Sequence, residues 1–222
     1  MKSYLIAGNW KSNKTRSEAK DWLREFKIQQ STRINTDSST VILCAPYTLL
    51  CFLNDEIRKR SFSLMLGAQD VSPYDNGAYT GAVNAKQIKE FAEWVIIGHS
   101  ERRKFFGESD TVLFQKVEQA KVAGLRIIYC VSDEHTAIPD VDVVAYEPVW
   151  AIGTGKADTP ENANTVIAAI KRKTQIQTVI YGGSVKLDNA ASYLFQPDID
   201  GVLLGGASLD AHAFAALLEL IH

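Results

Sequence analysis

The sequence predicts an α/β fold in which eight parallel strands close into a single (β/α)8 barrel. Runs of four to seven apolar or β-branched residues recur eight times along the 222 residues, as expected for strands buried on both faces of a parallel sheet. Helical segments lie between most of these runs, and this alternation is typical of parallel α/β proteins. No change in composition divides the chain, so we expect one domain over residues 1–222.

Each predicted strand is a short apolar run. In chain order the strands cover residues 4–7, 40–44, 64–68, 94–97, 125–131, 141–146, 178–181 and 201–204. An open, doubly wound sheet is the alternative, because the alternation of strands and helices does not report whether the sheet closes.

Helices are predicted where apolar residues repeat at helical spacing or where capping residues occur. In the first helix, Ala19, Trp22, Leu23 and Phe26 lie at i, i+3, i+4 and i+7. A further helix is expected to begin after Thr159, because Pro160 suits the first helical position. The predicted helices cover residues 17–29, 110–122, 160 to about 173, and 209–221.

The alternation of strands and helices is interrupted between the fifth and sixth predicted strands. Only residues 132–140 remain there, whereas a parallel crossover normally takes a dozen residues or more. We therefore expect a loop with at most one helical turn, and the fifth helix largely missing. Because Glu147 should face the mouth of the barrel, alternation sends Val144 and Tyr146 outward. Neighbouring helices or another chain should then cover these two side chains.

The overall composition excludes several classes of protein. A net charge of -2 argues against a nucleic-acid partner and against a surface suited to acidic membranes. No run of 18 apolar residues predicts a membrane helix. Cys44, Cys51 and Cys130 form neither a disulfide framework nor a metal motif, and the histidines show no metal spacing. We expect a cytoplasmic protein with no metal and no cofactor.

Chemically capable residues follow five of the predicted strands, at the barrel end where active sites of this fold lie. They are Asn9 and Lys11, His99 and Glu101, Glu147, the run from Gly182 to Ser184, and Gly205 with Gly206. Taken singly, each has an ordinary explanation as a solvated, structural or turn residue. Their occurrence at one end of one barrel predicts an active site.

Five segments closely resemble the triosephosphate isomerase family, and the resemblance runs from end to end of the chain. The segments are GNWK at 8–11, IGHSERR at 97–103, AYEPVWAIGTGK at 145–156, YGGSV at 181–185 and GGASL at 205–209. The resemblance implies a closed TIM barrel. It also implies the interconversion of dihydroxyacetone phosphate and glyceraldehyde 3-phosphate, in glycolysis and gluconeogenesis.

The resemblance also implies the roles of the catalytic residues. Glu147 would take a proton from the carbon next to a carbonyl. A neutral His99 would donate a hydrogen bond to the oxygen that becomes negative, while backbone N–H groups after it point at its other ring nitrogen. Asn9 and Lys11 would add a dipole and a positive charge. Glu101 would lie near Lys11, or it is simply an acidic residue at the start of a helix.

The phosphate site and the lid are implied in the same way. Gly205 and Gly206 would offer backbone donors at the start of the last helix, with Ser184 and Gly153 as further contacts. Residues 148–156, with Pro148, Val149, Trp150 and Lys156, resemble a closing lid. A nucleotide loop does not fit this segment, because Trp150 and Asp158 occupy positions where glycine would be required.

Residues 69–81 resemble a loop that inserts into a second subunit, which implies a homodimer; the alternative is a surface loop.

Two segments depart from the family. Val131-Ser132-Asp133 stands where Ile-Gly-Glu is usual, and that acid contacts the lid tryptophan in the family. Lys156-Ala157-Asp158 stands where Lys-Thr-Ala is usual.

Two functional alternatives remain: a non-catalytic barrel that binds phosphosugars, and another phosphosugar isomerase or epimerase.

Overall fold

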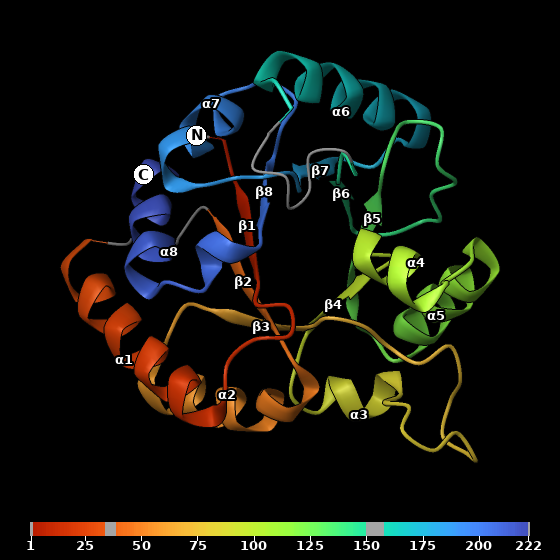
Figure 1. Cartoon of the computed structure of the whole chain (residues 1–222), viewed down its shortest axis with the longest axis horizontal. Helices are drawn as coiled ribbons and strands as arrows, with labels where there is room; N and C mark the ends of the chain where they lie inside the picture. Colours follow the sequence, from red (N-terminus) through yellow and green to blue (C-terminus); the bar gives the residue numbers. More distant parts are fainter. Residues whose placement is uncertain (1, 34–38, 150–157, 222) are drawn as a thin grey trace.

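The eight strands form the closed barrel that the sequence predicts (Figure 1). The computed structural model describes residues 2–33, 39–149 and 158–221. The strands are parallel and pair in chain order, and β1 pairs with β8 so that Leu5 lies opposite Gly201. This pairing excludes the open sheet. The strands are β1 Leu5–Asn9, β2 Thr40–Ala45, β3 Met65–Ala68, β4 Trp94–Ile97, β5 Arg126–Val131, β6 Val143–Tyr146, β7 Thr178–Tyr181 and β8 Gly201–Leu204.

The helices lie outside the ring of strands (Figure 1). They are α1 Arg16–Arg33, α2 Tyr47–Arg60, α3 Ala85–Lys89, α4 Ser100–Phe106, α5 Asp110–Val122, α6 Pro160–Thr174, α7 Leu187–Leu194 and α8 Ala211–Leu218. The bounds of α5 are those predicted. The α6 helix begins as predicted, because the Thr159 hydroxyl accepts a hydrogen bond from the Asn162 N–H at 3.2 Å.

The prediction of one last helix over 209–221 was wrong in part. The glycine turn leads instead into the short 3-10 helix Gly206–Ser208, and α8 starts afresh at Ala211. The reason is local: the Asp210 carboxylate accepts the Ala213 N–H at 2.9 Å and caps a new helix. Gly205 and Gly206 are therefore the cap and the first residue of a 3-10 turn, and they do not begin α8.

Apolar side chains pack in two layers, one inside the barrel and one between the strands and the helices. Side chains alternate along each strand, so every second residue points inward. The inner row of β1 is Leu5 and Ala7, and it continues into Asn9. The inner row of β6 is Val143 and Ala145, and it continues into Glu147. Filling the barrel thus aims the next residue of each row into its mouth.

The connection between β5 and β6 contains no helix, as predicted. The Asp133 carboxylate accepts hydrogen bonds from the N–H groups of His135 and Thr136, at 2.8 and 2.7 Å, in the manner of a helix cap that no helix follows. Lys121 of α5 pairs with Asp140 at 2.9 Å. The connection is therefore held by its own turn and by a neighbouring helix.

The outward side chains of β6 are covered, as predicted. Val144 is 0% exposed and Tyr146 is 4% exposed. They belong to the same buried cluster as apolar residues of α5 and α6, and Ile138 of the connection packs against that cluster. The chain itself covers the face that lacks a helix, so no second chain is needed there.

We expect Asp133→Ala to lower the free energy of unfolding by about 0.5–2 kcal/mol, as the loss of a helix cap does. Partial burial opposes ionisation, but the hydrogen bonds from Thr136, His135 and Ser132 outweigh it and lower the pKa of Asp133. The contribution is therefore present at neutral pH and is lost as the pH falls through that lowered pKa.

Urea denaturation of both proteins between pH 7 and pH 3 measures this difference. Asp140→Ala is the matched control, because its side chain is 96% exposed and exposed ion pairs contribute little. A pH-independent difference, or equal effects of the two substitutions, would contradict the capping role.

Candidate active site

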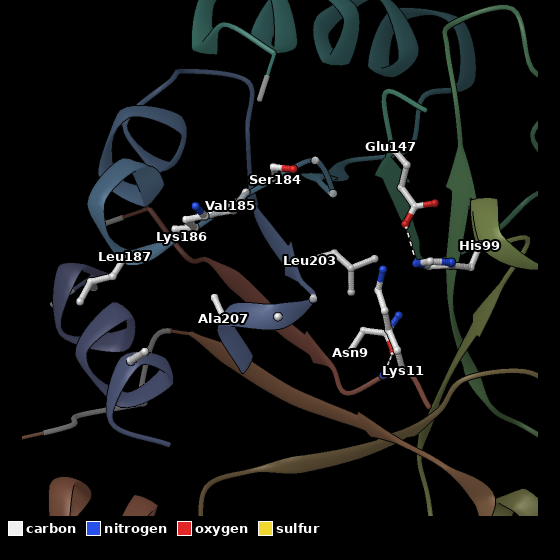
Figure 2. Close-up of a pocket in the computed structure, with 15 residues that line it drawn as sticks. Asn9, Lys11, His99, Glu147, Ser184, Val185, Lys186, Leu187, Leu203 and Ala207 are labelled. Atoms are coloured by element: carbon white, nitrogen blue, oxygen red, sulfur yellow. Dashed lines mark hydrogen bonds and ion pairs between the residues drawn. The ribbon is translucent and has the colours of Figure 1, made fainter. Parts of the chain in front are cut away.

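A cavity of about 480 Å³ lies at the carboxyl ends of the strands. It brings together most residues that the sequence predicted for the site, although they come from five different strand ends (Figure 2). They are Asn9, Lys11, His99, Glu147, Ser184, Gly205 and Gly206. Of the predicted lid, Pro148 is buried and Val149 is exposed, while Gly153, Trp150 and Lys156 lie outside the described residues.

Glu147 and His99 are in direct contact on one wall of the cavity (Figure 2). Glu147 is 2% exposed and His99 is 6% exposed. The distance from Glu147 Oε1 to His99 Nε2 is 3.1 Å. The other oxygen, Oε2, accepts the backbone N–H of Ser100 at 3.0 Å. Both oxygens of this nearly buried carboxylate therefore have donors.

The start of α4 fixes the protonation of the His99 ring. His99 is the residue before α4, and its Nδ1 accepts the backbone N–H of Glu101 at 3.2 Å. An acceptor nitrogen carries a lone pair, so the ring proton must be on Nε2, which faces Glu147. The ring is then a neutral imidazole that donates from Nε2. Only the Glu101 N–H points at Nδ1; the Ser100 N–H, which the resemblance also directed to this nitrogen, binds Glu147 instead.

A sharp turn at Lys11 places its ammonium group beside the cavity. Lys11 has a left-handed backbone, with φ of 52°. The Asn9 Oδ1 accepts the Lys11 N–H at 2.9 Å, and the Gln69 amide donates to the Lys11 carbonyl at 3.0 Å. Lys11 Nζ pairs with Glu101 Oε1 at 2.5 Å. Glu101 therefore lies near Lys11, and it is also in the first turn of α4, so both interpretations of this residue were correct.

The turns after β7 and β8 line another part of the cavity, with Ser184, Val185, Lys186 and Ala207 (Figure 2). A Cβ on Gly205 would lie 3.2 Å from Lys11 Cε, and a Cβ on Gly182 would lie 2.9 Å from Glu147 Cγ. Larger residues at these two positions would push against the charged groups. A Cβ on Gly206 would meet nothing within 4 Å, so an anion can approach the backbone of the Gly205–Gly206 turn, whereas the Gly182 N–H already donates to the Tyr146 carbonyl at 2.7 Å.

Three residues of the site were not assigned from the sequence. Ser100 holds Glu147 through its backbone, and Gln69 joins the ends of two strands by donating to Lys11 O and to Cys44 O at 3.1 Å. Cys130 lies in the inner layer, where burial, and secondarily the Glu147 carboxylate, raises the pKa of its thiol well above the usual value. Of these three residues, only Ser100 belongs to one of the five segments that predicted the active site, the segment IGHSERR.

The described residues contain neither a metal-binding cluster nor a membrane-spanning helix. No three His, Cys, Asp or Glu side chains in this part of the chain gather into a group that could hold a metal ion. Within the same residues no helix is long and apolar enough to span a membrane.

Comparison with known proteins gives one consistent family. The triosephosphate isomerase family model matches residues 4–140 and 133–221. The two matches overlap at the connection that lacks a helix. The triosephosphate isomerase of Synechococcus sp. (strain JA-3-3Ab) is 39% identical over 99% of this chain and 95% of its own length. That of Herminiimonas arsenicoxydans is 40% identical over 99% of both. The crystal structure of triosephosphate isomerase from Bartonella henselae superposes with a TM-score of 0.84 at 32% identity, over 98% of both chains.

The charge at Lys11 should control anion binding in the cavity. We expect Lys11→Ala to weaken the binding of inorganic phosphate about tenfold or more, because a hydrogen bond to a charged group is worth about 1.5–3 kcal/mol. The substitution also leaves Glu101 unpaired, which repels the anion. Isothermal titration with phosphate measures the change. Lys14→Ala is the matched control, because Lys14 lies over the Trp10 ring and does not line the cavity; equal losses in both variants would argue against an anion site at Lys11.

Proposed function

The chain belongs to the triosephosphate isomerase family, and we propose that Glu147 is the base and His99 the electrophilic partner with which it interconverts dihydroxyacetone phosphate and glyceraldehyde 3-phosphate. The observation that carries this proposal is the contact of 3.1 Å between a nearly buried carboxylate and a neutral imidazole on the cavity wall. A non-catalytic phosphosugar-binding barrel would not require this pair. A different phosphosugar isomerase or epimerase is disfavoured by the family membership.

The reaction moves one proton between two adjacent carbons. Glu147 takes the proton from the carbon next to the carbonyl, and the electron pair of the broken C–H bond moves toward the carbonyl oxygen to give an enediolate. His99 gives its Nε2 proton to that oxygen and takes the hydroxyl proton from the other oxygen, which becomes the new carbonyl. Glu147, now a carboxylic acid, then returns its proton to the neighbouring carbon and is a carboxylate again. To reach the substrate, the Glu147 carboxylate must leave the Ser100 N–H, which holds it at 3.0 Å. A base enclosed in this way is shielded from water, which favours proton transfer.

The charge that develops on oxygen needs donors already in place. His99 can donate from Nε2, because the Glu101 N–H occupies its Nδ1. Lys11 supplies a positive charge and Asn9 an amide dipole at the same side of the cavity. Such preorganised groups stabilise the transition state more than they would in water.

The phosphate is proposed to bind against the turns after β7 and β8, on the side where Gly205 lies next to Lys11. Ser184, Gly205 and Gly206 line that side, and Gly153 would complete the site from the lid. Closure of residues 148–156 over the cavity would exclude water and retain the enediolate, which can otherwise lose its phosphate. No cofactor is needed for this chemistry. We propose that the enzyme acts in the cytoplasm, in glycolysis and gluconeogenesis.

We also propose that the chain forms a homodimer through residues 69–81. This segment extends away from the barrel between β3 and α3 (Figure 1). Its Tyr74 and Tyr79 rings stack at 4.2 Å and are 46% and 45% exposed. At its base, Asp70 is anchored by Lys116 at 2.5 Å and by Arg102 at 2.9 Å. A rigid loop that exposes aromatic rings is typical of an interface.

A second cavity offers a place for the loop of the partner. It measures about 340 Å³ and is lined by Lys11, Tyr47, Glu101 and Phe106 among others. Because Lys11, Asn9 and His99 line both cavities, a loop seated here would press on the turn that carries Lys11. Assembly and activity should therefore be linked.

Replacing the base should abolish turnover while the protein still binds substrate. We expect Glu147→Gln to lower kcat by about 10²–10⁴ or more, with a modest change in KM, because the amide keeps the shape but cannot accept the proton. A coupled assay with glyceraldehyde 3-phosphate measures both constants. A variant within a few-fold of the wild type would refute the assignment.

Sedimentation at micromolar concentration should give twice the chain mass of 24.5 kDa. We expect the double variant Tyr74→Asp, Tyr79→Asp to sediment as a monomer of reduced activity, because charged side chains oppose burial at an interface. Val122→Asp is the control, since Val122 is 76% exposed on α5, away from the loop. A fully active wild-type monomer, or a double variant that remains a dimer, would contradict the proposal.

A further inference from the structure

Asp158 is a buried carboxylate that the proposed reaction does not use. It is 5% exposed and lies just before α6. Its side chain accepts hydrogen bonds from the Asn162 amide at 2.8 and 3.0 Å and from the Tyr146 hydroxyl at 3.4 Å. Its backbone N–H donates to the Tyr181 hydroxyl at 3.1 Å, and its carbonyl accepts from the Tyr193 hydroxyl. Three tyrosines thus converge on one residue.

The Asp158 carboxylate is costly to bury. Among the described residues its side-chain partners are Asn162, Tyr146 and the Thr159 N–H, and all of them are neutral. Removing a carboxylate from water without a cation requires good hydrogen bonds in return. The carboxylate therefore calls for an explanation in this chain.

Two of the three tyrosines belong to strand ends that carry the active site. Tyr146 is the last residue of β6 and directly precedes Glu147, and its carbonyl accepts the Gly182 N–H at 2.7 Å. Tyr181 is the last residue of β7, and its hydroxyl lies 2.1 Å from where a Cβ on Gly183 would be. The Tyr181 and Tyr193 rings stack at 4.3 Å. The cluster formed by Asp158, Tyr146, Tyr181 and Tyr193 therefore lies on the outer side of the turns that line the cavity.

The connection between β5 and β6 has no helix, and this explains why the cluster is needed. Tyr146 points to the face that such a helix would cover, and here it is buried without one. A buried phenol needs a hydrogen-bond partner, and Asp158 provides it. The Tyr146 ring also lies 6.1 Å from the Tyr181 ring. The end of β6 is thus held from outside by a side-chain hydrogen bond in addition to its packing with α5, α6 and Ile138.

We propose that Asp158 is a positioning residue. By accepting a hydrogen bond from the Tyr146 hydroxyl, it fixes the end of β6. The backbone of Glu147 then stays in place while the Glu147 carboxylate moves from Ser100 to the substrate. This inference rests on the proposed role of Glu147 as the base. Asp158 contacts no substrate and acts only through Tyr146. Its loss should therefore affect kcat, which depends on the position of the base, more than KM.

A double-mutant cycle tests the link between the two side chains. We expect Asp158→Ala and Tyr146→Phe each to lower kcat about fivefold or more, with KM changed less than about twofold. The double variant should be no slower than the slower single variant, because both substitutions remove the same interaction. Tyr146→Phe removes one oxygen and keeps the ring, so it tests the inference even if Asp158→Ala does not fold.

Tyr193→Phe is the matched control. It removes a buried tyrosine hydrogen bond to the same residue, but one made to the Asp158 carbonyl rather than to the carboxylate. It should lower the melting temperature and leave kcat within twofold of the wild type. Wild-type kcat in Tyr146→Phe, losses that multiply in the double variant, or an equal loss of kcat in Tyr193→Phe would each overturn the inference. If Glu147→Gln were active, the proposed role of Glu147 as the base would be wrong. Failure of that role and failure of the role of Asp158 are therefore distinguishable.

Discussion

The alternation of side chains along β6 is the constraint on which the site depends. Val143 and Ala145 fill the inside of the closed barrel, so Glu147 must enter its mouth, while Val144 and Tyr146 must pack outside. One strand therefore supplies the chemistry on its inner face and the support on its outer face. A shift of one residue in the pairing of β6 with β5 and β7 would turn Glu147 away from His99.

The first turn of α4 completes this arrangement from the neighbouring wall. Successive backbone N–H groups serve different partners there: that of Ser100 holds the Glu147 carboxylate, and that of Glu101 holds His99 Nδ1. The Glu101 side chain at the same turn pairs with Lys11. One helical turn thus contacts the proposed base, sets the tautomer of the proposed electrophile and fixes the nearby cation. The contacts to His99 and Lys11 can stay in place during the proposed reaction, whereas Glu147 must leave Ser100 to reach the substrate.

Most of the fold could be predicted because strands buried on both faces appear as continuous apolar runs. The bounds of β4, β7 and β8 were exact, and those of the other strands differ by at most two residues. The site could be predicted because strand ends meet in a barrel and because the segments resemble one family. Contacts between residues that are distant in the sequence could not be predicted. The hydrogen bond from Gln69 to Lys11 spans 58 positions, and the hydrogen bond from Tyr146 to Asp158 depends on where an outward side chain points. The break before α8 was missed because Asp210 was not recognised as a cap.

The central claim is that a proton is removed from carbon by Glu147 and exchanges with water before or during its return. Running the reaction in deuterium oxide and analysing the product by mass spectrometry or NMR tests it most directly. The account predicts deuterium on the carbon next to the carbonyl of the product made by the wild-type protein, and none above background with Glu147→Gln. Product formation or deuterium incorporation that persists at the wild-type level in Glu147→Gln would contradict it.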